Sequence, residues 1–209
     1  MVTGNEMKRR LSTQRSSLER LNSGRIARAL APSLFLAWFA MPSAIPQPSK
    51  PTEYDVKAAY LLNFGKFVRQ ANGGTPRSSF EICILGHDSM GPTIDELGAN
   101  QTIDNLPVHV HRLSDATDAK GCAIVFISAD EGDRLHEDLT LLSPFDVLTV
   151  GDAPDFLDRG GMIQFLLVQN HVRFSVNLNA VNRAHLVLSS ELLRVASSIT
   201  GKPSGGGLP

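Results

Sequence analysis

Two histidines in this 209-residue sequence have a spacing that suits metal ligands. His109 and His111 alternate with apolar residues, so on a strand both side chains would lie on one face. A zinc site needs a third ligand and usually a carboxylate that orients a histidine, and the sequence has no H-E-x-x-H motif or comparable cluster. We therefore interpret the pair as surface histidines on an edge strand and predict no metal site.

The stretch "LTVGDAPDFLDRGGMIQF", residues 148–165, places glycines and an aspartate at strand ends, where phosphate loops and catalytic turns often occur. No G-x-G-x-x-G motif, Walker lysine or G-x-S-x-G elbow accompanies a predicted strand. We interpret the stretch as a structural turn, in which Asp152 caps "APDFL" and Gly160-Gly161 reverse the chain; a ligand-sensing or partner-contact loop is the alternative. No catalytic residue and no cofactor is predicted, and the protein is not expected to be an enzyme.

Arg173 and Asn177 form another candidate group, in the segment "RFSVN". Because they are four residues apart on a predicted strand, they share a face and could hold an anionic ligand. They could equally cap or pin a hairpin, and the residues alone leave both interpretations open.

The charge distribution divides the chain into two parts. Residues 1–44 contain seven Lys and Arg against two Asp and Glu, whereas the remainder contains 13 against 19. The second part is acidic, with no basic run and few aromatic residues, so nucleic acid is not expected as a partner.

The first part is typical of an export signal. Arg25 and Arg28 precede 13 mostly apolar residues, 29–41, a length that suits a signal peptide and is too short to span a bilayer. We predict a signal peptide over residues 1–44 and a periplasmic location, with an uncleaved anchor or a buried helix as the alternative.

The rest of the chain divides into three segments. Residues 45–52 contain three prolines and are predicted to be a linker, residues 53–201 to be the folded domain, and residues 202–209, "KPSGGGLP", to be a flexible tail. The domain contains two cysteines, Cys83 and Cys122. In an oxidising compartment an even number suggests a disulfide, although free buried cysteines are also common in apolar runs.

Helices and strands alternate along the predicted domain. Periodicity and capping residues predict helices over residues 53–70, 90–97, 129–142, 178–185 and 189–198, with helical turns at 114–119 and 153–157. Apolar or alternating runs predict strands over residues 80–86, 106–112, 122–128, 146–150, 162–168 and 172–177, the last two joined in a hairpin by "QNH". This order predicts a three-layer α/β/α domain with a largely parallel sheet and an antiparallel C-terminal hairpin.

Seven segments, in order, resemble the YfiR family of small exported proteins. They are "AAYLLNFGKFV", "FEICILG", "LPVHVHRLSD", "GCAIVFIS", "VLTVGD", "GGMIQF" and "VRFSVNLNAVNRAHLVLSSELLRVA". The resemblance extends over residues 54–196. It implies a periplasmic α/β domain that is not an enzyme, commonly dimerises, and restrains a membrane diguanylate cyclase through the periplasmic region of that cyclase.

The resemblance also bears on individual residues. The family's cysteines in the first and third strands match Cys83 and Cys122, which implies a disulfide between them. A second cysteine pair found in some members is absent here. In the first helix, Tyr60, Phe64 and Phe67 are candidates for contact with a partner or a second copy, with core packing as the alternative.

Two functional hypotheses follow. The first is a periplasmic repressor of an inner-membrane signalling protein, expected to be a diguanylate cyclase, that lowers cyclic-di-GMP output and biofilm formation. The second is a periplasmic small-ligand binding module that serves a transporter or a sensor kinase, with its site near Arg173 and Asn177.

Overall fold

The computed structural model describes residues 50–71, 73 and 76–202, which all fall within one unit of the chain, residues 48–209. The predicted signal peptide lies outside the described residues, as do most of the predicted linker and tail. Within the part of the chain that is described, no helix is both long enough and apolar enough to cross a bilayer.

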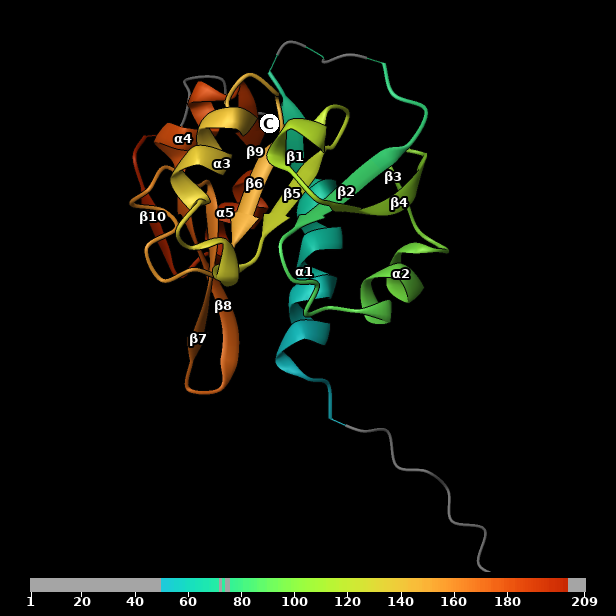
Figure 1. Cartoon of the computed structure of the whole chain (residues 1–209), viewed down its shortest axis with the longest axis horizontal. Helices are drawn as coiled ribbons and strands as arrows, with labels where there is room; N and C mark the ends of the chain where they lie inside the picture. The colour runs from blue at the N-terminus through green and yellow to red at the C-terminus, as the bar shows by residue number, and fades with distance from the viewer. Residues whose placement is uncertain (1–49, 72, 74–75, 203–209) are drawn as a thin grey trace, which may run out of the picture. The chain divides into compact units, whose positions relative to one another are not determined.

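The described chain alternates short helices with strands (Figure 1). The helices are α1 (Glu53–Phe67), α2 (Pro92–Gly98), α3 (Leu135–Leu142), α4 (Leu178–Arg183) and α5 (Ser190–Val195), with 3-10 turns η1 (Ala116–Ala119) and η2 (Ala129–Glu131). The strands are β1 (Val68–Gln70), β2 (Phe80–Leu85), β3 (Thr102–Ile103), β4 (Leu106–Leu113), β5 (Ile124–Ile127), β6 (Leu148–Gly151), β7 (Ile163–Val168), β8 (His171–Asn177), β9 (Leu186–Leu188) and β10 (Ser198–Thr200).

Eight of these strands form one sheet, in the order β10-β8-β7-β6-β5-β2-β4-β3. Neighbours from β4 to β7 are parallel, whereas β7 and β8 form an antiparallel hairpin. The predicted fold class is therefore confirmed: the domain is α/β, with a curled and mostly parallel sheet that ends in an antiparallel hairpin.

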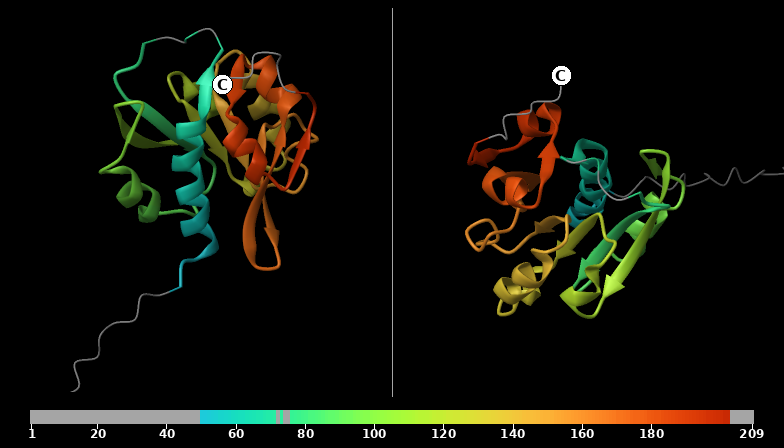
Figure 2. Two further views of the ribbon diagram at one scale, coloured as in Figure 1. Left: turned by 180° about the vertical axis from the view of Figure 1, so that it is seen from behind. Right: turned by 90° about the horizontal axis from the view of Figure 1, so that it is seen from above.

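Helices cover both faces of the sheet (Figure 2). Alternation along β2 directs Ile82 and Ile84 into the core under α1, and Cys83 and Leu85 into a second core under η1 and α3. Phe64 is fully buried in the first core, where its ring centroid lies 5.0 Å from that of Phe174. Aromatic pairs at this separation add to the stability that burial supplies.

Two predicted helices are too long at their C-terminal ends. The helix predicted over residues 53–70 stops at Phe67, because Val68–Gln70 is extended and pairs with β9 in a separate two-stranded sheet. The helix predicted over residues 189–198 stops at Val195, after which Ser198–Thr200 adds a parallel strand beside β8. Both errors have one cause: pairing with a distant strand decides the conformation, and local periodicity does not report it.

The helix predicted over residues 129–142 is interrupted. Residues Ala129–Glu131 form a 3-10 turn, and the α-helix begins only at Leu135. The acidic residues at its predicted start instead hold loops, since the Asp130 carboxylate accepts hydrogen bonds from the Ser128 hydroxyl and from the backbone N–H of His87.

Candidate functional site

Two of the predicted site residues, Tyr60 and Arg173, line the same cleft. The cleft lies between the start of α1 and the β7–β8 hairpin, and we call it the hairpin cleft. Its volume is about 540 Å³. Residues 50–53, Val56 and Tyr60 line the helix side, and Leu167 and residues 170–173 line the hairpin side. The hairpin projects beyond the rest of the sheet, toward the N-terminal end of α1 (Figure 1).

A capping box fixes the helix side of the cleft. The Thr52 hydroxyl accepts a hydrogen bond from the Asp55 N–H at 3.2 Å, and the Asp55 carboxylate accepts one from the Thr52 N–H at 2.8 Å. These bonds favour the ionised carboxylate and hold the pKa of Asp55 below its ordinary value. The start of α1 is therefore well defined, and so is the position of the cleft wall.

Tyr60 connects the cleft to the core. Its ring centroid lies 5.7 Å from that of Phe174 and 6.0 Å from that of Phe165, and the side chain is only partly buried. The aromatic contacts fix the ring, while its remaining surface lines the cleft.

A tight turn fixes the hairpin side. Gln169 and Asn170 have positive φ angles of 49° and 60°, as a two-residue hairpin turn of type I′ requires. Strand β7, which leads into this turn, ends in two large exposed apolar side chains: Leu167, which lines the cleft, is 53% exposed, and Val168, on the opposite face of the strand, is 48% exposed. Apolar groups at the tip of a projecting hairpin are typical of a surface that another molecule covers.

Arg173 adds a charge to this wall. It is exposed, and its guanidinium makes no hydrogen bond or ion pair with any other described residue. A free guanidinium is suited to a planar anion such as a carboxylate. The hairpin cleft therefore combines apolar surface with an uncommitted positive charge.

The other candidates lie elsewhere. Phe64 has no exposed surface, so its side chain is a core residue and is closed to any outside contact. Phe67 is partly buried at the far end of α1, against the same core. Asn177 does not join Arg173: its side chain accepts a hydrogen bond from the Ala180 N–H, which caps α4, and donates one to the Leu157 carbonyl, both at 3.2 Å. Asn177 therefore has the structural role that the sequence left open.

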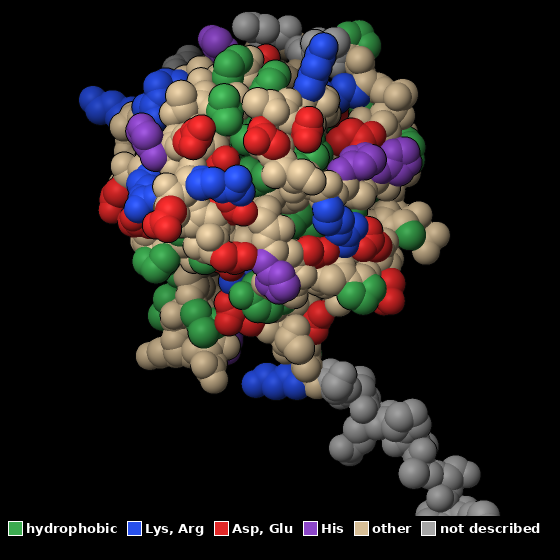
Figure 3. Space-filling view, viewed as in Figure 1, with side chains coloured by type: hydrophobic (Ala, Val, Ile, Leu, Met, Phe, Trp, Pro, Cys, Tyr) green, Lys and Arg blue, Asp and Glu red, His purple; other side chains and the backbone are tan. Residues whose placement is uncertain are grey.

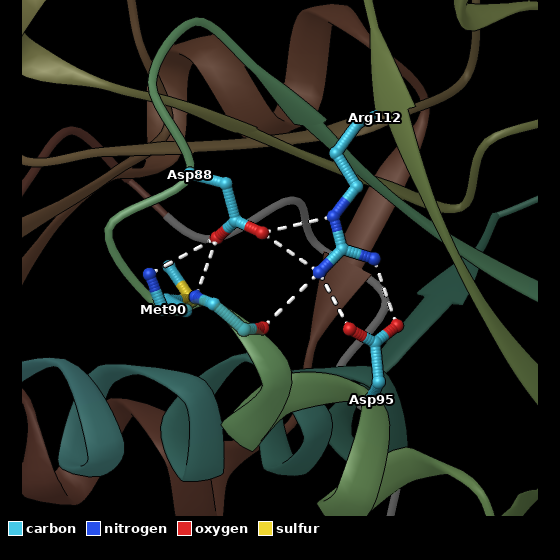
Figure 4. Close-up of polar contacts among 5 residues, drawn as sticks. Asp88, Met90, Asp95 and Arg112 are labelled. Carbon is cyan, nitrogen blue, oxygen red and sulfur yellow. Dashed lines mark hydrogen bonds and ion pairs between the residues drawn. The ribbon is translucent and has the colours of Figure 1, made fainter.

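At the carboxyl edge of the parallel strands, where open α/β sheets usually bind ligands, charged side chains bind each other instead (Figure 4). Arg112, in β4, donates to the carboxylates of Asp88 and Asp95 and to the Gly91 carbonyl. The hydrogen bond to Asp95 raises the pKa of Arg112, and the same contact lowers the pKa of Asp95. This network ties the loop after β2 and helix α2 to β4.

Asp152 joins three segments at the same edge. One carboxylate oxygen accepts a hydrogen bond from the Ala129 N–H at 2.9 Å, and the other lies 2.7 Å from Lys57 Nζ, which also contacts Glu53 at 2.7 Å. Burial alone would lower the pKa of Lys57, but its bonds to Asp152 and Glu53 outweigh burial and raise it. Asp152 therefore links β6 to α1 and η2, rather than capping the segment that follows it.

The glycines around Asp152 also have a structural explanation. Gly160 has a φ of 103°, which lets the chain reverse before β7. An added Cβ would lie 2.4 Å from the Phe156 ring at Gly151 and 2.1 Å from it at Gly161. The two glycines thus leave room for a fully buried ring, in agreement with a structural turn.

The cysteines and the paired histidines lie near each other on the face of the sheet that η1 and α3 cover. Cys83 and Cys122 form a disulfide with a Cα–Cα distance of 6.0 Å. His109 and His111 are exposed on β4, as expected, but Glu81 of the adjacent strand hydrogen-bonds both of them. The role of Glu81 was not predicted from the sequence, because only the strand register shows which residue faces the histidines.

Comparison with known proteins gives the family. The sequence model of the YfiR/HmsC-like family matches residues 54–197, so the chain belongs to that family. Membership is consistent with a periplasmic regulator of a diguanylate cyclase. No curated protein shows significant sequence similarity to the chain.

Two solved structures have a partly similar chain path. A conserved domain protein from Vibrio cholerae O1 biovar El Tor aligns with a TM-score of 0.49 and 9% identity, over 73% of this chain and 62% of that one. The ABC domain in complex with L-Trp from Streptococcus pneumonia aligns with a TM-score of 0.44 and 10% identity, over 58% of this chain and 55% of that one. This chain therefore spans less than two thirds of the length of either structure.

Proposed function

We propose that this protein is a periplasmic repressor that binds the outer region of an inner-membrane diguanylate cyclase and lowers its cyclic-di-GMP output. Family membership supports the class of the protein, and the hairpin cleft supports the location of the contact. The observation that carries the proposal is the exposure of Leu167 in a cleft that is also lined by Arg173, whose guanidinium has no partner among the described residues. A complementary partner segment would present apolar side chains flanked by a carboxylate.

Repression follows from differential affinity. A repressor that binds the inactive conformation of a cyclase more tightly than the active one shifts the population toward the inactive state. To change the ratio of inactive to active cyclase from 1:99 to 99:1, the repressor must bind the inactive conformation roughly 10⁴-fold more tightly than the active one. No catalytic residue is needed in the repressor for this mechanism.

The surface charge agrees with a protein partner. On the face in Figure 3, acidic and basic side chains are interspersed, and lysines and arginines do not gather into the continuous basic patch that nucleic-acid binding uses. A homodimer is a further part of the proposal. The edge strand β10 and the end of α5 expose Ile199 at 42% and Val195 at 64%, and either this edge or the cleft could form the contact between copies.

A second function is favoured by the dimensions of the hairpin cleft. Its volume of about 540 Å³ is comparable to that of small-molecule sites, and Arg173 could hold an anionic group. In that case the protein would be a ligand-binding module that serves a transporter or a sensor kinase.

Capture of the partner separates these functions. The full chain, tagged at its C-terminus and expressed in its own host, would be cross-linked, purified from solubilised membranes and analysed by mass spectrometry. We expect a diguanylate cyclase with a periplasmic region to be recovered with the native chain and lost with Leu167→Asp. The matched control is Leu97→Asp, which places the same charge on an exposed leucine of α2. Recovery of a transporter or sensor kinase, without a cyclase, would contradict the repressor and favour the second function.

A further inference from the structure

We propose that Glu81, His109 and His111 form a binding site for a divalent transition-metal ion, with Zn²⁺ as the preferred occupant. This inference rests on the register of two strands and goes beyond the proposed function. It stands or falls independently of the cyclase partner.

Strand pairing brings the three side chains together. In the parallel pair of β2 and β4, Glu81 is opposite His109, and Cys83 is opposite His111. Because side chains two residues apart on a strand share a face, Glu81 and both histidines lie on one face of the sheet. The six residue pairs of β2 and β4 hold these positions in a regular ladder.

The ligand atoms are close enough to share one ion. His109 Nδ1 lies 3.3 Å from Glu81 Oε1, His111 Nε2 lies 2.6 Å from Glu81 Oε2, and the three ligand atoms all lie within 4.8 Å of one another. Zinc–nitrogen and zinc–oxygen bonds of about 2.1 Å in a tetrahedron place ligands roughly 3.4 Å apart. Rotation of side chains therefore needs to shorten the widest separation and to lengthen the 2.6 Å contact between His111 and Glu81, and the histidine side chains can rotate because they are 55% and 56% exposed.

The carboxylate is the least mobile of the three ligands. The Glu81 side chain is 21% exposed, and its Oε1 atom accepts a hydrogen bond from the Ser79 hydroxyl. A partner of this kind orients a ligand and strengthens metal binding. Glu81 would act as the fixed ligand, and the two imidazole rings would rotate to place their nitrogens around the ion.

The ligand set determines the class of ion. Two imidazole nitrogens and one carboxylate oxygen suit zinc and its transition-metal neighbours, whereas Mg²⁺ and Ca²⁺ prefer oxygen ligands throughout. Three protein ligands leave a fourth position open to water or to a group from another molecule. The site also borders a cavity of about 450 Å³ that Glu81 and His111 share with both cysteines.

Zinc binding to the mature protein, purified without a polyhistidine tag, tests this proposal directly. Isothermal titration with Zn²⁺ alone should give saturable binding of one ion per chain. Glu81→Gln, His109→Ala and His111→Ala should each weaken the affinity at least tenfold. His136→Ala removes an exposed histidine from α3 and should leave the affinity unchanged.

Two further measurements keep the result interpretable. Circular dichroism and a negative free-thiol assay should show that each variant is folded with its disulfide intact, so that thiolates cannot contribute ligands. Co²⁺ bound in place of zinc should give the visible absorption bands of a tetrahedral or five-coordinate ion in the native chain, and lose them in His111→Ala. Absence of saturable binding by the native chain, or equal affinity in the three ligand variants, would overturn the proposal.

Discussion

At the carboxyl edge of the parallel strands, Asp88, Asp130 and Asp152 each hold another segment of the chain, whereas the guanidinium of Arg173 in the hairpin cleft contacts no other described segment. The edge is the usual ligand site of an open α/β sheet, but here its charged groups are occupied by contacts within the fold. The cleft combines exposed Leu167 with a positive charge, that of Arg173, which has no partner among the described residues. The comparison indicates that charged residues at a customary ligand site can be structural, and it is the reason why we propose the partner contact at the hairpin cleft.

This comparison predicts that substitutions in the two regions have different effects. Changes in the scaffold should alter stability and leave partner binding intact as long as the chain is folded. Changes in the hairpin cleft should weaken partner binding and leave stability nearly unchanged.

The largest effect on stability should come from the disulfide. Cys83 and Cys122 are 39 residues apart, and cross-linking a loop of that length stabilises a protein by about 4 kcal/mol in the chain-entropy description. The double variant Cys83→Ala/Cys122→Ala should lower the free energy of unfolding by about that amount in urea titrations. Thiol labelling of the unreduced, unfolded native chain should find no free cysteine; two labelled cysteines would contradict the bond.

The next largest effect should come from Asp152. Asp152→Asn leaves Lys57 Nζ, whose side chain is 5% exposed, with Glu53 as its charged partner, and disruption of a buried ion pair costs about 3 kcal/mol. Glu53→Gln removes the more exposed partner and should cost about 0.5 kcal/mol. Urea titration of both variants measures the difference in the free energy of unfolding. Equal losses would show that Asp152 is no more important to the fold than Glu53 and does not link β6 to α1 and η2 as proposed.

A smaller effect of opposite sign is expected at Asp138. Its Oδ2 atom is buried with no hydrogen-bond partner among the described residues, and burial together with the charge of Glu131 raises the pKa of its carboxyl group. The native state then binds the proton more tightly than the unfolded state, so the free energy of unfolding falls as pH rises through the folded-state pKa.

Asp138→Asn should therefore raise the free energy of unfolding by about 1 kcal/mol at neutral pH. The gain should disappear below the ordinary pKa of an aspartate, where the native residue is protonated in both states. Urea titrations at several pH values measure this trend. A gain that is constant with pH would assign the effect to packing instead of charge.

The smallest effect on stability is expected in the hairpin cleft. Arg173→Ala removes an exposed side chain that has no partner in the described chain, so its stability should stay within about 0.5 kcal/mol of the native value. Binding of the membrane partner should nevertheless fall at least tenfold. Arg194→Ala, on the exposed side of α5, is the matched control and should change neither property.

The sequence alone predicted the layers of this fold well. Nearly continuous apolar runs such as "FEICIL" and "IVFI" correspond to the central strands β2 and β5, because a strand covered on both faces is mostly apolar. It did not predict β1, β9 or β10, which are short and depend on pairing with a distant strand.

The candidate sites were predictable only in part. Tyr60 and Arg173 were singled out from their positions on a helix and a strand, but their meeting in one cleft depends on tertiary structure. Lys57 and Glu81 were missed because Asp152 and the two histidines, which contact them, lie on other segments of the chain. For Glu81, a single charged residue within an otherwise apolar strand is a signal that could have drawn attention to it.

The most direct test of the central claim is the cyclic-di-GMP content of host cells that lack this gene and are complemented with variants exported at equal levels. The native chain and the control Leu97→Asp/Arg194→Ala should lower cyclic-di-GMP, whereas Leu167→Asp/Arg173→Ala should leave it at the level of the deletion strain. If the cleft variant lowers cyclic-di-GMP as fully as the native chain, the hairpin cleft is not the repressing surface. If the native chain itself changes nothing, the protein does not repress a cyclase.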